Sequence, residues 1–448
     1  MIPPPDYRLS TIATSSPMRN LSRPARRYLL HAALLTFGLA VSGLFYNLLI
    51  VALGYDQQTL RLPVVGELSL LGLLNSLPVV VAGLSSLPIW WLVSRFGPRR
   101  ALLASALLSA GSLLGTALGR EPLALLAAAA LGGPASVLFQ VSAAPFMMRH
   151  SGQEERDTLF ALSAGLNIGV AGLGSLVGGL IPGLATTLLG LPPQSADTYR
   201  VTFAAAAAIT ALAALPLLWN VERSAPSVER PSAEPGIVPE DSQDNSIARP
   251  AATTGLAEQL RFVLRSTRSA LRFMLSPLLI SCGASLLIPY LNLYFRQRYG
   301  APDAALGLIF AAVGVATGAA TLAAPLLSRR LGKMSSVVLT QSLAIPCLLL
   351  LGLAPTLWLA AGIALTRGAL MNMAAPLYDA YAMERTPEPA RPIVIGLING
   401  AFAAGYVIGP TVSAEVQRSY GFGPLFGATA ALYGCAALAN YLLFVRRR

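Results

Sequence analysis

Arg367 is the residue of this chain best placed to do chemistry, because it alone among 32 basic residues lies deep inside an apolar segment, away from both of its ends. It stands about ten residues from the start of a segment spanning roughly 357–383, which at 1.5 Å per residue puts it near the middle of a bilayer. A guanidinium at that depth must face protein rather than lipid, and it suits bidentate binding of an anionic group. The alternative is a structural arginine bonded to backbone carbonyls and polar side chains.

The helical face around Arg367 can be read from spacing. Residues four, seven and eleven positions further on share that face, so Met371, Ala374 and Tyr378 are expected beside the arginine. Asn372 lies about 140° around the helix and is a less direct neighbour.

Other polar residues stand at a similar depth. Asn47 and Asn292 occupy matching places in Phe45-Tyr46-Asn47-Leu48 and Leu291-Asn292-Leu293-Tyr294. They suit hydrogen bonds to a polar substrate, or bonds between helices at an outer gate. The candidate substrate contacts are Arg367, Asn47, Asn292, Gln140, Met371, Tyr378 and Tyr290.

Titratable groups are scarce near the middle of the apolar segments. The carboxylates Asp379, Glu67 and Glu415 stand close to segment ends, His31 at a segment edge and His150 in a loop. Proton-coupled transport usually needs a buried titratable group. The sequence therefore does not support proton coupling.

Catalytic and metal-binding patterns are missing from the sequence. The three cysteines lie inside apolar segments, with neither metal nor disulfide spacing. There is no Gly-x-x-x-x-Gly-Lys-Ser/Thr loop for ATP. We expect no enzyme activity, no cofactor and no metal site.

The elements that must position these residues are membrane helices. The chain is 54% hydrophobic and 12% charged, whereas soluble domains carry roughly 25% charged residues. The net charge of +12 gathers at the ends of apolar segments, which argues against a nucleic-acid partner. Twelve segments have the length of about 20 residues that a span needs, approximately 28–53, 65–93, 100–119, 122–148, 158–185, 199–221, 271–297, 303–327, 335–354, 357–383, 393–417 and 422–445.

These segments form two copies of one unit. Leu71-Gly72 and Arg95-Phe-Gly97 have counterparts in Leu306-Gly307 and Arg330-Leu-Gly332. Each pair is 235 residues apart, as 307 less 72 shows. A constant offset in an apolar chain indicates a duplicated membrane bundle. The predicted fold is an all-α integral membrane protein of 12 transmembrane helices in two pseudo-symmetric six-helix bundles.

The basic residues predict the orientation. With the N-terminus inside, 25 of the 32 fall on cytoplasmic segments and six outside, which follows the positive-inside rule. We expect both termini in the cytoplasm and the chain in the plasma (inner) membrane. The expected organisation is a disordered tail (1–27), a first bundle (28–221), a linker (222–270) and a second bundle (271–448). The linker should end in a basic amphipathic helix on anionic lipid headgroups or, alternatively, on a partner protein.

Three motifs resemble the major facilitator superfamily. The loop Ser94-Arg95-Phe-Gly97-Pro-Arg99-Arg100 resembles its signature loop, with a serine in the acidic position. The run from Gly174 to Gly179 and its counterpart Gly409-Pro410 resemble a glycine–proline motif found in antiporters of the superfamily. Leu365-Thr366-Arg367-Gly368 resembles its intramembrane arginine motif, which usually lies in the fourth span. Here the matching fourth-span position is Gly132.

The resemblance implies a secondary transporter that moves a small solute by alternating access, with Arg367 contacting an anionic or polar metabolite. One alternative is efflux of drug-like, apolar or cationic compounds, with Arg367 structural. Another is a non-transporting sensor or scaffold. We expect a monomer. Asp379 could pair with Arg329 or Arg330, or it could be a surface-gate or solvated carboxylate. The gating candidates are Arg95, Gly97, Arg99, Arg100, Arg330, Gly332, Asp379, Gly174, Gly409 and Pro410.

Overall fold

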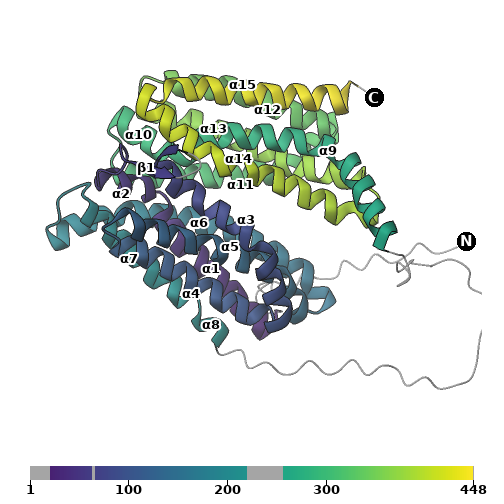
Figure 1. Cartoon of the computed structure of the whole chain (residues 1–448), viewed down its shortest axis with the longest axis horizontal. Coiled ribbons are helices and arrows are strands. Elements are labelled where there is room, and N and C mark those ends of the chain that lie inside the picture. Colours follow the sequence, from purple (N-terminus) through teal and green to yellow (C-terminus); the bar gives the residue numbers. More distant parts are fainter. Residues whose placement is uncertain (1–20, 63–65, 219–255, 447–448) are drawn as a thin grey trace, which may run out of the picture.

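The protein is a bundle of long helices in a computed structural model that describes residues 21–62, 66–218 and 256–446 (Figure 1). Twelve helices within those ranges are long and apolar enough to cross a membrane, which confirms the predicted fold. The first six spans are α1 (Arg23–Gly43) with α2 (Tyr46–Ala52), α3 (Leu70–Phe96), α4 (Pro98–Leu118), α5 (Pro122–His150), α6 (Gln153–Leu189), and α7 (Ala196–Leu212) with α8 (Leu215–Leu218).

The second six spans repeat this order. They are α9 (Leu256–Leu287) with η1 (Ile288–Tyr290) and α10 (Leu291–Tyr299), α11 (Asp303–Leu331), α12 (Lys333–Leu353), α13 (Leu357–Glu384), α14 (Arg391–Tyr420) preceded by η2 (Glu388–Ala390), and α15 (Gly423–Asn440) with η3 (Tyr441–Val445).

A short hairpin departs from the all-helical prediction. Strands β1 (Thr59–Leu62) and β2 (Gly66–Ser69) pair antiparallel, with Thr59 opposite Ser69. Thr59 to Leu62 alternates polar and apolar residues, and Gly66 has a φ of 86°, which only glycine adopts readily. The second span therefore begins at Leu70 rather than near residue 65.

Two helix starts also differ from expectation. Helix α1 begins at Arg23, inside the predicted tail, because the Ser22 side chain accepts a hydrogen bond from the Ala25 amide and caps it. Helix α9 begins at Leu256 and continues into the seventh span without a break. Outside the described residues lie the predicted tail up to residue 20, the end of the predicted first bundle (219–221), most of the linker (222–255) and the side chains of 256–270, which include the predicted basic stripe.

The two halves share one packing plan, as the duplication requires. In the first half α1 packs on α6 and α7, while α5 packs on α3 and α4. In the second, α9 packs on α14 and α15, while α13 packs on α11 and α12. Gly97 and Gly332 turn the chain with nearly equal angles, φ 86° and 81°. The repeat in the sequence is thus a repeat in space.

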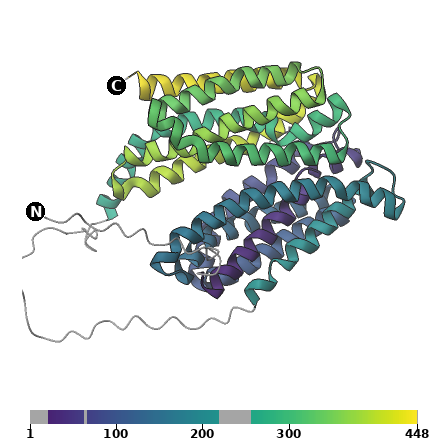
Figure 2. The same ribbon diagram turned by 180° about the vertical axis from the view of Figure 1, so that it is seen from behind.

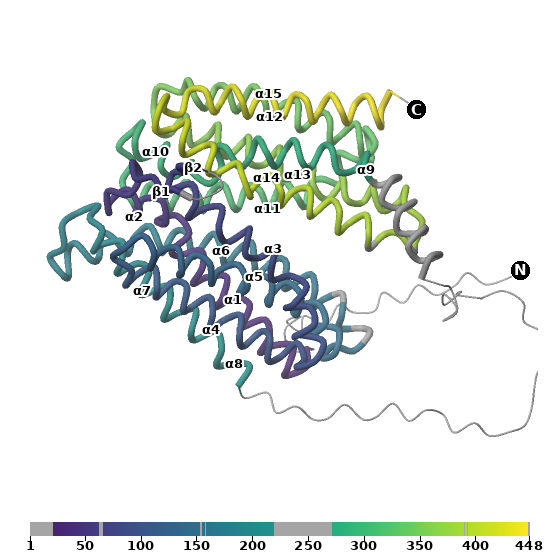
Figure 3. The backbone as a smooth tube through the Cα atoms, in the orientation of Figure 1, coloured from purple at the N-terminus to yellow at the C-terminus, as the bar shows by residue number. Residues whose placement is uncertain are grey.

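The halves converge at the end that carries the hairpin and diverge toward the end where the described termini lie (Figures 1 and 2). We call these the hairpin end and the open end. Helix α14 contacts α3 and β2 of the other half, and α11 contacts α6. The tube in Figure 3 shows α2, α10 and the hairpin side by side at this junction.

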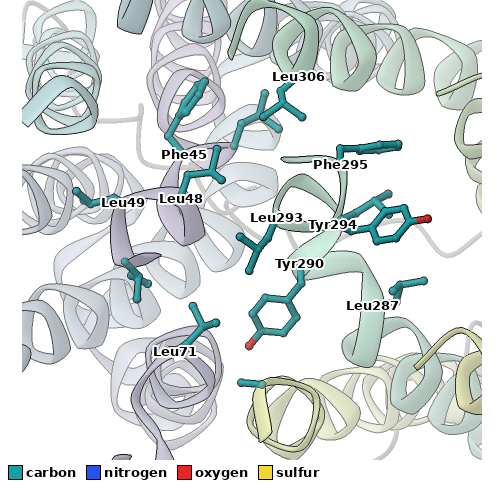
Figure 4. Packing of buried hydrophobic residues seen from close by; sticks show 14 of the residues in the cluster. Phe45, Leu48, Leu49, Leu71, Leu287, Tyr290, Leu293, Tyr294, Phe295 and Leu306 are labelled. Carbon is teal, nitrogen blue, oxygen red and sulfur yellow. The ribbon is translucent and has the colours of Figure 1, made fainter. Parts of the chain in front are cut away.

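The largest hydrophobic cluster joins the halves at the hairpin end (Figure 4). Phe45 and Leu71 come from the first half, and Leu293 and Phe295 from the second. All four are at most 3% exposed. Burying apolar surface of this kind holds the halves together there, at roughly 25 cal/mol per Å².

Candidate substrate cavity

A cavity of about 370 Å³ lies within the second half, between α9, α12, α13, α14 and α15. Its walls combine aromatic and aliphatic surface with a few polar groups, which is the usual composition of a small-molecule site. The polar and aromatic lining residues are Ser276, Gln341, Arg367, Asn372, Tyr378, Asp379, Asn399, Phe402, Tyr406 and Tyr433.

Arg367 is buried against this cavity, with 6% of its surface exposed. Its guanidinium donates a hydrogen bond to the hydroxyl of Tyr433 from α15. Its Nε is buried and has no hydrogen-bond partner among the residues that the structure describes. An unpaired donor on a buried cation is unfavourable by about 1–3 kcal/mol or more. The arginine is therefore held by the fold but has a donor left for something else.

Helix α13 presents two stripes to the cavity. The first contains Arg367 with Met371, Ala374 and Tyr378, the residues that helical spacing places together. Tyr378 is anchored by donating to the Phe273 carbonyl at 2.8 Å.

The second stripe contains Asn372, Ala375 and Asp379, displaced from the first by about 100–140° around the helix. Asn372 and Ala375 are exposed and Asp379 half-buried. Asn372, expected to be a less direct neighbour, also lines the cavity. A single helix thus supplies a cationic and an acidic wall.

The matched asparagines lie outside the cavity, at the junction of the halves. Asn47 Nδ2 donates to the Pro289 carbonyl at 2.6 Å, and Asn47 Oδ1 accepts from Asn75 at 2.8 Å. Asn292 donates to the Leu44 carbonyl of the opposite half. Of the two roles left open for this pair, this geometry supports the outer-gate hydrogen bonds.

Two other residues that were predicted to contact the substrate do not line the cavity. Tyr290 is fully buried and donates to the Pro410 carbonyl at 2.9 Å, which ties η1 to α14. Gln140 is exposed on α5, and it is absent from the cavity lining.

Two glycine contacts related by the repeat reinforce the junction. A Cβ on Gly307 would lie 2.7 Å from the Ser175 carbonyl oxygen and 2.8 Å from the Gly179 Cα. A Cβ on Gly72 would overlap Thr411 and lie 3.1 Å from the Pro410 carbonyl oxygen. Adding 235 converts Gly72 into Gly307 and Ser175 into Pro410. Backbone therefore meets backbone at two symmetric points.

One further polar cluster joins the halves at this end, and it has no symmetric copy. We call this cluster, the asparagine hydrogen bonds and the glycine contacts together the hairpin-end closure. The Tyr199 hydroxyl of the first half donates to Asp303 Oδ1 at 3.2 Å. Asp303 also pairs with Arg296 of its own half. Both charged side chains are largely buried, at 13% and 11% exposure.

The predicted gating residues fall into three groups. Arg99 donates to the Leu217 and Leu218 carbonyls, both at 3.0 Å, so it caps the end of α8. Arg95 stacks near the Trp91 ring, 5.5 Å from its centroid. The other two arginines, Arg100 and Arg330, are exposed.

The glycine–proline candidates serve close packing. A Cβ on Gly174 would lie 2.7 Å from the Ala40 Cβ of α1, and one on Gly409 would overlap Ser285 of α9. Small residues at these places let α6 and α14 approach their neighbours closely. Pro410 lies inside α14, where its carbonyl accepts from Tyr290.

Two titratable residues need comment. Of the alternatives left open for Asp379, the pairing with Arg329 or Arg330 is not formed; no ion pair in the described part of the chain includes Asp379. His31 is fully buried rather than at a span edge, since α1 begins earlier than expected. Its Nδ1 lies 2.7 Å from the Ala213 carbonyl oxygen.

Sequence reasoning missed Tyr406 and Phe402 as cavity residues. The offset of 235 places them opposite Ala171 and Asn167. Tyr378 likewise stands opposite Ala143. A search for positions where the second copy carries a larger side chain than the first would have found the tyrosines, just as it singles out Arg367 opposite Gly132.

Two related six-helix halves, joined at one end and holding a charged cavity, define a membrane transporter rather than an enzyme. The family model described as the Major Facilitator Superfamily matches residues 35–410 and 273–448. The chain belongs to this superfamily. It is a multi-pass membrane protein and a secondary active transporter of a small-molecule substrate.

Solved structures with the same fold are distant in sequence. The nucleoside transporter NupG is 12% identical with a TM-score of 0.69, covering 95% of this chain and 100% of that one. A bacterial homologue of the human lysosomal transporter Spinster is 14% identical at 0.67, covering 95% and 99%. A D-xylose-proton symporter is 15% identical at 0.65, covering 93% and 97%. No curated protein matches the chain.

Proposed function

We propose that this transporter carries an anionic or polar metabolite whose anionic group binds Arg367. The observation that carries the proposal is the buried Nε of Arg367, which lacks a partner and belongs to a side chain lining the cavity. A carboxylate or phosphate in the cavity would neutralise this cation in a low-dielectric site.

The proposal includes an orientation. In the proposed orientation the open end faces the cytoplasm and the hairpin end the exterior of a plasma (inner) membrane, and the positive-inside distribution of basic residues supports this direction. The cavity would then exchange solute with the cytoplasm in this conformation, and the hairpin-end closure would separate it from the exterior. We propose a monomer, with basic residues of the open end near anionic headgroups.

A binding screen tests the role of Arg367. Purified protein is screened by thermal shift against anionic, neutral and cationic solutes of similar size, and ligands are re-tested with Arg367→Gln. We expect anionic ligands to dominate, and their affinity to fall about tenfold or more in the variant, because a charge-assisted bond is worth about 1.5–3 kcal/mol. Arg385→Gln is the matched control, since Arg385 lies at the end of the same helix, exposed and over the Tyr381 ring.

Efflux of cationic or apolar compounds is the second candidate, favoured by Phe402 and Tyr406 in the cavity wall together with the acidic Asp379. It predicts cationic ligands that keep their affinity in Arg367→Gln. That result would show that Arg367 does not bind the substrate. Its role would then be structural, through its hydrogen bond to Tyr433.

A further inference from the structure

We propose that the transported solute is dipolar, with its anionic group on Arg367 and a cationic group on Asp379. This inference rests on the proposed role of Arg367 and adds a second recognition point to the same cavity. It narrows the substrate class from anions to amphoteric solutes that carry two separated charges.

The geometry of α13 keeps the two charges apart. Arg367 and Asp379 are twelve residues apart on one helix, or about 18 Å along its axis at 1.5 Å per residue. They also stand about 120° apart around the helix, on the two stripes described above. Both line one cavity, yet neither can neutralise the other directly.

Both charged groups retain binding capacity. Arg367 has its orphaned Nε. Asp379 is half-buried and enters no ion pair among the described residues. Glu384, on the same helix as Asp379, does form an ion pair, with Lys333 of α12. A half-buried carboxylate without a cation is disfavoured unless something pairs with it. The fold thus keeps one unpaired charge of each sign in a single cavity.

The rest of the cavity wall suits the middle of an elongated solute. It includes amides from Asn372 and Asn399 and aromatic rings from Phe402 and Tyr406. These groups offer neutral hydrogen bonds and flat apolar contact, but no third charge. A solute with ionic ends and a polar or apolar middle therefore matches the groups that line the cavity.

A series of linear ω-amino carboxylates of 4 to 12 carbons measures the charge separation that the site accepts. Each is compared with the unbranched alkanoate of equal chain length, using purified full-length protein and calorimetric or thermal-shift binding. We expect the amino acid to bind about tenfold or more tightly than its alkanoate at one or two longer chain lengths, and not at the shortest.

Two variants identify the groups responsible. Asp379→Asn should abolish the advantage of the amino group without weakening alkanoate binding, because it removes a negative charge from the cavity, and Arg367→Gln should weaken both series. Glu384→Gln is the matched control, because it removes a carboxylate from the same helix outside the cavity. It should leave the preference intact.

Three results would overturn the inference: no amino acid of any length binding better than its alkanoate, no binding in either series, or an advantage that survives Asp379→Asn. If alkanoates still bind in an Arg367-dependent manner, the proposed function stands and only the dipolar substrate is lost. If neither series depends on Arg367, the proposed function fails as well.

Discussion

The two ends of the interface between the halves differ in how closely the halves contact each other. At the hairpin end, backbone contacts at Gly72 and Gly307, hydrogen bonds from Asn47 and Asn292, and a large apolar cluster join the halves. Toward the open end the helices splay apart, and an ion pair at that end, between Lys333 and Glu384, lies within the second half. The contacts at the hairpin end therefore hold the halves in this conformation. Each of these contacts can be removed by a separate substitution.

The largest effect is expected from filling both symmetric glycine contacts. The double variant Gly72→Val and Gly307→Val would drive side chains into backbone atoms, which cannot rotate away. Overpacking is unfavourable by about 1–3 kcal/mol per site, and distant sites add. We expect the hairpin end to open, seen as a longer spin-label distance between Glu121→Cys and Gln297→Cys after Cys282, Cys347 and Cys435 are replaced by serine.

The matched control is the pair Gly83→Val and Gly314→Val, on the same two helices but with open space around each added Cβ. It should keep the parent distance. An unchanged distance in the Gly72 and Gly307 double variant would show that these contacts do not hold the closure.

A smaller effect is expected from Asn47→Ala. It removes the bond to the Pro289 carbonyl and one of the two bonds that the Asn75 amide donates, leaving that amide only its bond to the Leu71 carbonyl. Buried groups left unsatisfied destabilise by about 1–3 kcal/mol. The same label pair should report a partial shift toward the longer distance, whereas Asn372→Ala, whose amide bonds only within its own helix, should not. Equal distances in the two variants would contradict a role for Asn47 in closure.

The smallest effect is expected from Tyr199→Phe, which removes one hydroxyl donor to Asp303 and leaves the pair with Arg296 in place. A single hydrogen bond contributes about 0.5–1.5 kcal/mol. The label distance should shift slightly, and the thermal midpoint should stay near that of the parent. A shift as large as that of Asn47→Ala would mean that Tyr199 supports more than this bond.

The sequence predicts the halves well because hydropathy and the repeat are local and periodic signals. Residue spacing predicts the positions of the spans, the turns at Gly97 and Gly332, and the residues that share the helical face of Arg367. What joins different helices does not follow from spacing. Nothing in the segment of Tyr199 indicates that it meets Asp303, since pairing across halves depends on how two rigid bundles settle against each other.

Because contacts between helices do not follow from spacing, the sequence also failed to predict several contacts at the cavity. Tyr406 and Tyr433 reach Arg367 from two other helices. Pairing with an arginine at the open end was one alternative for Asp379, but this half-buried residue lines the cavity without an ion-pair partner among the described residues. One-helix geometry predicts the face of a residue, but not the neighbouring helix that the face will meet.

The pair formed by Arg296 and Asp303 has a consequence for the electrical behaviour of the carrier. Both residues belong to the second half, and only the neutral Tyr199 belongs to the first. When the halves separate at this end, the two opposite charges travel together, so the closure transfers almost no net charge through the membrane field. The voltage sensitivity of the empty carrier should then come mainly from Arg367, the charge nearest the middle of that field.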